Sequence, residues 1–269
     1  MTLELELIEP VKSILSDVEA ATGKPLKFIE KDNIDFFAAV KIARRSMPAH
    51  IVFYRKQHDA IINHLVAHEC GHILRMFGAA EEKRLIPAKS RDDRAVLQEI
   101  EGDLKKISKM IPMRELVQVV GTWRNGLMTQ LTNYPPDIMI EKWIYDGYPE
   151  LRPYQLQSLE RQNKQALKGI SRKVQMITPA KIYNSSNIMN YAFFNILGGY
   201  TKADLARPYR NTPFSNKGKQ LIKLTEKDYV NTYEGDISMI DKWAEFLGLS
   251  KWYDWVGFED VPLDYLNSV

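Results

Sequence analysis

Two histidines four residues apart, with a glutamate directly after the first, are the residues best suited to chemistry in this chain. His68, Glu69 and His72 lie in an apolar-periodic stretch that predicts a helix from about His64 to Leu74. On a helix, residues i and i+4 share a face, so both imidazoles can reach one ion. Neutral imidazole nitrogens suit Zn²⁺, which in hydrolytic sites keeps one position for water. Glu69 projects about 100° further round the helix, where it could accept a proton from that water without binding the metal.

The residues around the motif favour a helix that presents its histidines along one stripe. His64, His68 and His72 align when residues are placed at about 100° intervals. Gly71, inside the helix, costs about 1 kcal/mol relative to alanine and indicates close packing there. The alternative interpretation is an exposed histidine face on which Glu69 is only a half-buried hydrogen-bonding group. The other broad side of the helix carries Ile62, Leu65, Val66, Glu69, Cys70, Ile73, Met76 and Phe77.

The run from His68 to His72 resembles the active-site helix of the zincin metallopeptidases. Two predicted strands, 38–44 and 50–55, come just before it, and zincins similarly place a small sheet there. The resemblance implies an α+β fold, with a small N-terminal sheet and the active-site helix in a zincin-like domain over residues 1–150. A mostly helical C-terminal region, 151–269, would pack on that domain. The substrate would lie extended along the strand 50–55, acting as an edge strand of the cleft.

The same resemblance implies an activity, the zinc-dependent hydrolysis of bonds in a peptide or protein substrate. His68, His72 and a third acidic residue would hold Zn²⁺, and Glu69 would be the general base that takes the proton of the attacking water. A different interpretation keeps the zincin-like fold as a regulatory or protein-binding module whose metal serves structure only. A chance motif in an all-helical interaction protein is a further alternative, and fold alone does not decide among them.

The resemblance implies an acidic third ligand from a helix after the motif. The metzincin pattern, with a third histidine there, is excluded because His72 is the last histidine in the chain. We predict Glu141, since the third ligand of the Glu-type zincins comes from a later helix. Asp137, one turn before it, either replaces Glu141 as ligand or accepts the second N–H of a ligand histidine. Glu99 and Glu101 also remain open. The 27-residue interval from His72 to Glu99 is similar to that of the ImmA/IrrE-like metallopeptidases.

The elements that must position these acids are predicted to be helices. Apolar spacing predicts one helix over 113–131 and another over 136–145, with a break at 133–136 because proline suits the first turn of a helix. Apolar spacing also predicts a helix over 9–22, and the stretch 78–89 is predicted to be a charged loop. The aromatic end of the chain, 243–258, is expected to pack onto the body of the protein.

Composition and charge argue against several other classes of protein. The 37 basic and 34 acidic residues leave a net charge of +3, so nucleic acid is not an expected partner. No apolar run is long enough to predict a membrane span, and the start of the chain does not resemble a signal peptide. Cys70 is the only cysteine, which fits a reducing compartment. We therefore expect a cytoplasmic protein, and the sequence leaves its oligomeric state open.

Overall fold

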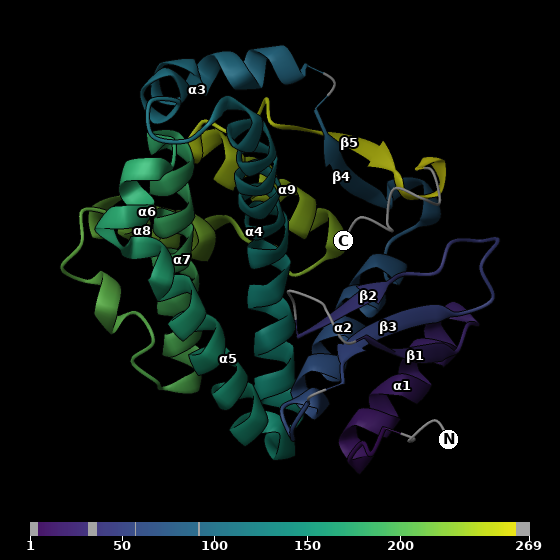
Figure 1. The fold of residues 1–269 in the computed structure, drawn as a ribbon. Helices are drawn as coiled ribbons and strands as arrows, with labels where there is room; N and C mark the ends of the chain where they lie inside the picture. Colours follow the sequence, from purple (N-terminus) through teal and green to yellow (C-terminus); the bar gives the residue numbers. More distant parts are fainter. Residues whose placement is uncertain (1–4, 32–36, 57, 91, 262–269) are drawn as a thin grey trace.

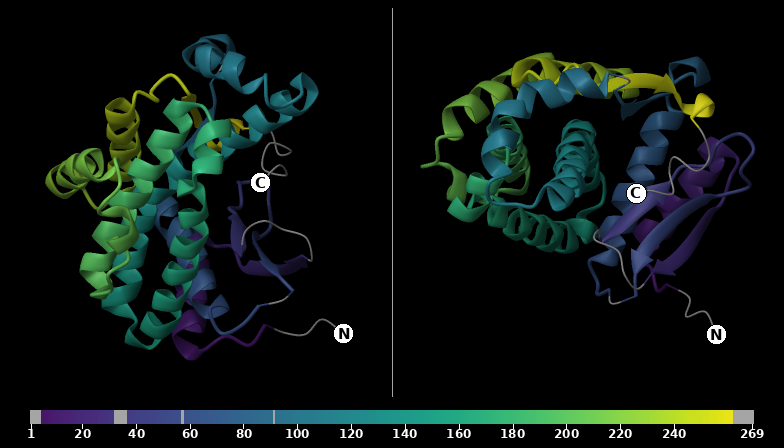
Figure 2. Two further views of the ribbon diagram at one scale, coloured as in Figure 1. Left: turned by 60° about the vertical axis from the view of Figure 1, so that its left-hand side comes forward. Right: turned by 45° about the horizontal axis from the view of Figure 1, so that its top comes forward.

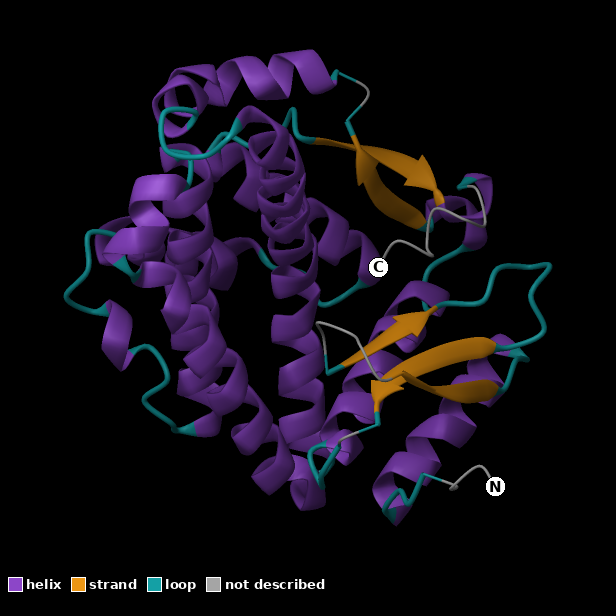
Figure 3. Cartoon of the chain, in the orientation of Figure 1, coloured by secondary structure: helices purple, strands orange, loops and turns teal. Residues whose placement is uncertain are grey.

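Helices dominate this protein, and its strands form two small sheets. The computed structural model describes residues 5–31, 37–56, 58–90 and 92–261. Both sheets lie on the right in Figures 1 and 3, and most of the helices gather on the left. The protein is thus α+β, with a small N-terminal sheet and a mostly helical C-terminal half, as predicted. None of the described helices is both long and apolar enough to cross a lipid bilayer.

The N-terminal sheet has the strand order β1-β3-β2. β1 (Leu26–Lys31) runs parallel to β3 (His50–Arg55), and β2 (Ala38–Lys41) runs antiparallel to β3. The prediction that strand 50–55 is an edge strand is therefore wrong, because β3 is hydrogen-bonded on both sides. The edge strand next to the histidine helix is β2. That helix, α2 (Ile62–Phe77), packs with α1 (Glu9–Thr22) beside the sheet.

Residues at the ends of α1 show why it forms where the sequence predicts a helix. Pro10 lies in the first turn, where a missing backbone N–H has no intrahelical partner to lose. Gly23 ends the helix in the left-handed conformation, with φ 68°, and its N–H donates to the carbonyl of Glu19. Val11, Ile14 and Val18 are fully buried on the inner face of the helix.

One long helix, α4 (Met113–Gly147), runs through the stretch 133–136, where a break was predicted. The prediction of two helices is wrong because Pro135 and Pro136 lie inside α4. Each proline removes one backbone donor from the helix, but tertiary packing on several sides holds the helix together. Leu131 and Ile138, which flank the prolines, are 0% and 1% exposed. The hydroxyl of Tyr229 lies 2.6 Å from the carbonyl oxygen of Pro135, which gives that oxygen a partner outside the helix.

The remaining long helices surround α4, and the right-hand view of Figure 2 looks nearly along its axis. α4 contacts α5, α7 and α9 as well as α2. Packing from several directions explains why α4 is apolar on more than one side. The bounds of these helices are α3 (Asp93–Ile107), α5 (Arg152–Ala166), α6 (Arg172–Ile177), α7 (Ala180–Thr201), α8 (Ser215–Asp228) and α9 (Tyr233–Leu247).

The second sheet joins two segments far apart in the sequence. β4 (Leu85–Lys89) pairs antiparallel with β5 (Tyr253–Gly257). The prediction of a loop over 78–89 is wrong for its second half, because pairing with a distant strand stabilises β4 and leaves no local pattern. The expected packing of the aromatic end is confirmed, since Trp243 and Trp252 are both 0% exposed.

The apolar core consists of two clusters, and α4 contributes to both. Leu131 and Ile138 belong to the cluster formed by the C-terminal helices. Ile140 and Ile144 belong to the cluster formed by α1, α2 and the N-terminal sheet. Asp137 and the residues just after it therefore lie where α4 passes from one cluster to the other. The division of the chain near residue 150 stays a prediction.

Candidate metal centre

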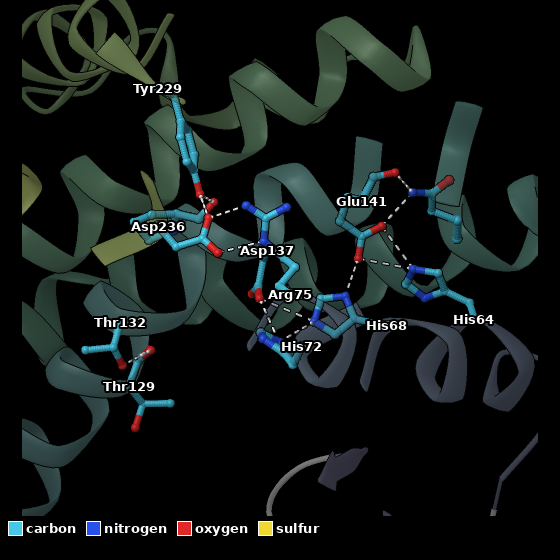
Figure 4. A network of polar contacts seen from close by, with 12 residues as sticks. His64, His68, His72, Arg75, Thr129, Thr132, Asp137, Glu141, Tyr229 and Asp236 are labelled. Carbon is cyan, nitrogen blue, oxygen red and sulfur yellow. Dashed lines mark hydrogen bonds and ion pairs between the residues drawn. The ribbon is translucent and has the colours of Figure 1, made fainter. Parts of the chain in front are cut away.

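Three histidines of α2 lie on one side of the helix and face α4 (Figure 4). The His64 side chain is 2% exposed, whereas 16% of His68 and 21% of His72 is exposed. The opposite side of α2 is anchored in the N-terminal cluster, where Val66 and Ile73 are fully buried. This anchoring fixes the rotation of α2 and keeps the histidine stripe toward α4.

Asp137 of α4 lies where His68 and His72 converge (Figure 4). Its Oδ1 atom is 3.3 Å from Nε2 of His68 and 3.2 Å from Nε2 of His72. The two Nε2 atoms are 3.2 Å apart, so the three atoms form a nearly equilateral triangle. Oδ1 of Asp137 is buried, and within the described residues neither of these contacts has the angles of a hydrogen bond. A buried acceptor without a hydrogen bond, close to two ring nitrogens, fits the role of a metal ligand.

The dimensions of this triangle fit zinc. For a tetrahedral ion with bonds of 2.0 to 2.2 Å, neighbouring ligand atoms should lie about 3.3 to 3.6 Å apart. The observed separations of 3.2 to 3.3 Å are close to this range. Two imidazoles and a carboxylate are a donor set that suits Zn²⁺ and leaves a fourth position for water. His68, His72 and Asp137 could therefore hold one such ion.

Glu141, which was predicted to be the third ligand, approaches the other edge of the His68 ring. Its Oε1 is 2.8 Å from Nδ1 of His68, and its two oxygens lie 3.1 and 3.0 Å from Nε2 of His64. If Nδ1 of His68 carries a proton and donates it to Glu141, the lone pair of Nε2 stays free for a metal. The geometry thus places Asp137, not Glu141, at the point where His68 and His72 meet.

Gln155 of α5 holds Glu141 in position from behind. Its Nε2 donates to Oε2 of Glu141 at 2.6 Å and to the backbone carbonyl of Glu141 at 2.7 Å. Gln155 is 0% exposed and Glu141 is 3% exposed. His64, His68 and Glu141 also form a second group of ligand-type atoms within 4.8 Å of one another. Because Gln155 and both histidines supply hydrogen-bond partners to Glu141, hydrogen bonding accounts for this second group.

The buried acids and histidines shift one another's pKa. Burial disfavours the charged form of His68, but the carboxylates of Asp137 and Glu141 outweigh burial and raise the pKa of His68 well above its usual value. Burial acts to raise the pKa of Asp137 and of Glu141, yet the neighbouring histidines lower both. The site therefore has a strong preference for positive charge, which a proton or a metal cation can supply.

The two helices of the site approach most closely at Gly71. A Cβ atom at this position would lie 2.6 Å from Cγ2 of Ile140, so even alanine does not fit without movement. Gly71 lies between His68 and His72 on α2, and Ile140 lies just before Glu141 on α4. The contact therefore sets the spacing between the histidines and the acids. The close packing predicted at Gly71 is confirmed.

Arg75 links the histidine helix to the C-terminal helices. Its Nε and Nη2 donate to the two carboxylate oxygens of Asp236 on α9, at 2.6 and 2.5 Å. The hydroxyl of Tyr229 lies 2.6 Å from the same carboxylate (Figure 4). Burial raises the pKa of Asp236, although Arg75 and Tyr229 oppose the rise. No local pattern in the sequence signals contacts between residues so far apart in the chain. For this reason the sequence did not predict the roles of Arg75, Asp236, Tyr229 and Gln155.

Glu69 and the two other candidate acids have different surroundings. Glu69 is half-buried and makes no hydrogen bond or ion pair within the described part of the chain. Glu99 pairs with Lys181, 2.5 Å away, and also accepts a hydrogen bond from Trp252. Glu101 pairs with a lysine one turn along α3 and is 58% exposed. Neither Glu99 nor Glu101 belongs to the group of ligand-type atoms around His68.

A cavity of about 150 Å³ opens beside His72. Ile42, just after the edge strand β2, and Leu85 and Ile86 of β4 contribute apolar lining. Arg75 and Asp236, which pair with each other, also line it, and a cavity of about this volume can hold a group the size of benzene. The proposed ion would thus lie next to a space for one apolar side chain, with an edge strand at its border.

Comparisons with known proteins add no family to these observations. No family model, curated protein or solved structure matches this chain. The resemblance to the zincins therefore stays a prediction from the motif and the strands predicted before it.

Proposed function

We propose that this protein is a zinc-dependent peptidase in which His68, His72 and Asp137 hold the metal and Glu69 is the general base. The observation that carries the proposal is the triangle of Nε2, Nε2 and Oδ1 atoms with edges of 3.2 to 3.3 Å. In this proposal Asp137 takes the role first predicted for Glu141. Glu141 becomes the carboxylate that orients the His68 ring and fixes its tautomer.

In the proposed hydrolysis, zinc, Glu69 and the residues that hold Glu141 would each have a separate role. Bound zinc would polarise the scissile carbonyl and lower the pKa of water toward about 7. Glu69 would accept the proton of the attacking water on its carboxylate and then donate it to the leaving amine. Gln155 and His64 would keep Glu141 ionised and in place behind His68, because both contact its oxygens.

Two surface features favour a peptide as the substrate. β2 is an edge strand among the described strands, and an extended chain can pair with such an edge through backbone hydrogen bonds. The cavity beside His72 supplies an apolar space for one side chain of that chain. Together they support the hydrolysis of peptide bonds over the hydrolysis of a small polar ester or amide.

The test is the substitution Glu69→Gln, with Glu82→Gln as a matched control at an exposed position. We expect the Glu69→Gln variant to bind zinc at the unchanged stoichiometry, measured by elemental analysis. Its hydrolysis of a quenched-fluorescent peptide library should fall by about 10²- to 10⁴-fold, the usual contribution of general acid–base catalysis. Unchanged hydrolysis would refute the role of Glu69.

The same preparation tests the main alternative. Stoichiometric zinc in the original protein without cleavage of any library member would favour a zincin-like regulatory or protein-binding module. Absence of zinc after reconstitution would refute the metal site itself.

A further inference from the structure

A second cavity, of about 530 Å³, lies between α4, α5 and α7. Its lining on α4 begins at Thr122 and ends at Asp137, so it follows the helix for about 22 Å at 1.5 Å per residue. Tyr134, Asp137 and Asn187 are buried in its floor, whereas Gly126 and Asn133 are exposed at its rim. The cavity is thus a long groove, which we call the α4 groove, and one end of it reaches the candidate metal centre.

The α4 groove is lined by neutral hydrogen-bonding groups. Asp137 is the one charged residue among the described residues that line it. A phosphate or a carboxylate would find no cationic side chain there, and the carboxylate of Asp137 already lies against His68 and His72, so the groove suits an uncharged ligand. The amides that line it are Gln130, Asn133, Gln162, Gln165, Asn187 and Asn190.

Two buried polar atoms in the lining have no partner. Oδ1 of Asn187 and Oγ1 of Thr178 make no hydrogen bond within the described structure, and these residues are only 2% and 8% exposed. Leaving such a group unsatisfied costs about 1 to 3 kcal/mol. Other amides of the groove are already fixed, because Asn190 accepts hydrogen bonds from Gln130 at 2.6 Å and from Tyr134 at 2.8 Å. The groove therefore combines fixed groups with free acceptors that an N–H or O–H donor could satisfy.

Two glycines help to keep the α4 groove open. Gly126 and Gly169 both line it, and a Cβ atom added at either would meet nothing within 4 Å. Gly126 lies inside a helix, where glycine costs about 1 kcal/mol relative to alanine. A larger side chain at Gly126 would project into the open space of the groove.

The shape of the groove indicates an extended chain. The lining follows α4 for about 22 Å, a length that suits an elongated ligand rather than a compact one. At about 3.3 Å per residue, an extended strand of this length would have six or seven residues. Amide side chains both donate and accept hydrogen bonds, as the peptide groups of an extended chain require.

We propose that the α4 groove binds an extended peptide segment of about six residues that carries no charged side chains. The binding itself is independent of any metal. Only its link to catalysis, through Asp137 at the end of the groove, rests on the proposed peptidase function.

The experiment uses the full chain with Glu69→Gln, so that nothing is cleaved, both with and without zinc. The probe is a library of acetylated and amidated hexapeptides made of Ala, Ser, Val, Leu and Gln. A matched library contains Lys or Glu at two positions. Affinity selection with mass spectrometry identifies the retained peptides, and calorimetry measures their dissociation constants. We expect retention of neutral peptides and weak or no retention of charged ones, with or without zinc.

Two variants locate the site. Gly126→Leu fills the groove, and Gly121→Leu places the same side chain on α4 outside the lining. Gly126→Leu should weaken peptide binding by about tenfold or more, which is ~1.4 kcal/mol, and Gly121→Leu should leave it unchanged. Circular dichroism checks that both variants are folded.

Other outcomes would overturn the proposal. These are no retained peptide, equal retention of both libraries, or equal effects of the two variants. If the protein bound peptides but no zinc, the groove proposal would stand and the proposed peptidase function would be refuted. The failure of one proposal can therefore be distinguished from the failure of the other.

Discussion

Replacing each of the two acids of α4 by its amide tests which of them is the metal ligand and which only orients a ligand histidine. Asp137→Asn removes the charged oxygen that lies 3.2 to 3.3 Å from both Nε2 atoms. Glu141→Gln keeps the size of the side chain but removes the carboxylate 2.8 Å from Nδ1 of His68. We expect Asp137→Asn to abolish stoichiometric zinc binding and Glu141→Gln only to weaken it.

The magnitude for Glu141→Gln follows from its place behind the ligand. Loss of an outer partner of a ligand histidine typically lowers metal affinity by about 10- to 100-fold, which is ~1.4 to 2.7 kcal/mol. The Asp137→Asn variant should lose more than about 100-fold, because a ligand and its negative charge are lost together. Since both residues are buried, the Glu141→Gln variant should also unfold at a lower urea concentration.

Competition with a chromophoric zinc chelator measures the affinity, and circular dichroism establishes that each variant is folded. Asp146→Asn, an exposed position on the same helix, is the matched control and should bind zinc like the original protein. Zinc retained by Asp137→Asn and lost by Glu141→Gln would refute our reasoning and restore Glu141 as the ligand. Equal losses in both variants would refute the division of roles between them.

Three further predictions follow from the same contacts. Gly71→Ala should lower the free energy of unfolding by about 1 to 3 kcal/mol, because its Cβ meets a side chain of α4. Gly102→Ala, with nothing near its Cβ, should raise that free energy by up to about 1 kcal/mol in the same urea titration. In the metal-free protein the raised pKa of His68 stabilises the fold below the usual value of 6.5, and this contribution is lost as the pH rises through the folded-state pKa. Zinc requires the deprotonated ring, so the rise in melting temperature on adding zinc should grow with pH, and a constant rise would contradict this assignment. Arg75→Ala should cost about 3 to 5 kcal/mol in urea unfolding, because it leaves a buried carboxylate on α9 without its partner.

Elements with a strong local pattern could be predicted from the sequence. The helix 9–22 and the strand 50–55 form over the predicted ranges, and the histidine helix extends the predicted one by a few residues at each end. Periodic apolar residues bury one face of each of these elements, so nearby residues alone determine the element. The pairing of β4 with β5 depends on a partner at the other end of the chain, and for this reason no local pattern predicted it.

The prolines of α4 show where local rules are overridden. Pro135 and Pro136 are good evidence for a helix start in isolation, because they lack the N–H that a helix interior uses. In the folded protein the helix continues through them, since buried residues on either side pack against other helices. Tertiary packing outweighed the local cost, which only the complete fold reveals.

The choice between Asp137 and Glu141 could not be made from the sequence for a geometric reason. The two acids are one turn apart on α4, and His64, His68 and His72 are each one turn apart on α2. Because the acids and the histidines repeat at the same interval, the sequence allows α4 to pair with α2 in more than one register. In the structure Asp137 lies between His68 and His72, and Glu141 lies between His64 and His68.

A shift of α4 by one turn, about 5.4 Å, would move Glu141 into the place that Asp137 now has. The contact of Gly71 with Ile140 selects the observed alignment, because the branched side chain needs a position on α2 without a Cβ atom. Most positions on this face of α2 carry a histidine or another side chain, so Ile140 packs at Gly71. This contact fixes where Asp137 and Glu141 lie along α2. The identity of the third ligand is therefore determined by the packing of an apolar residue, which explains why a search for acidic residues at suitable intervals could not settle it.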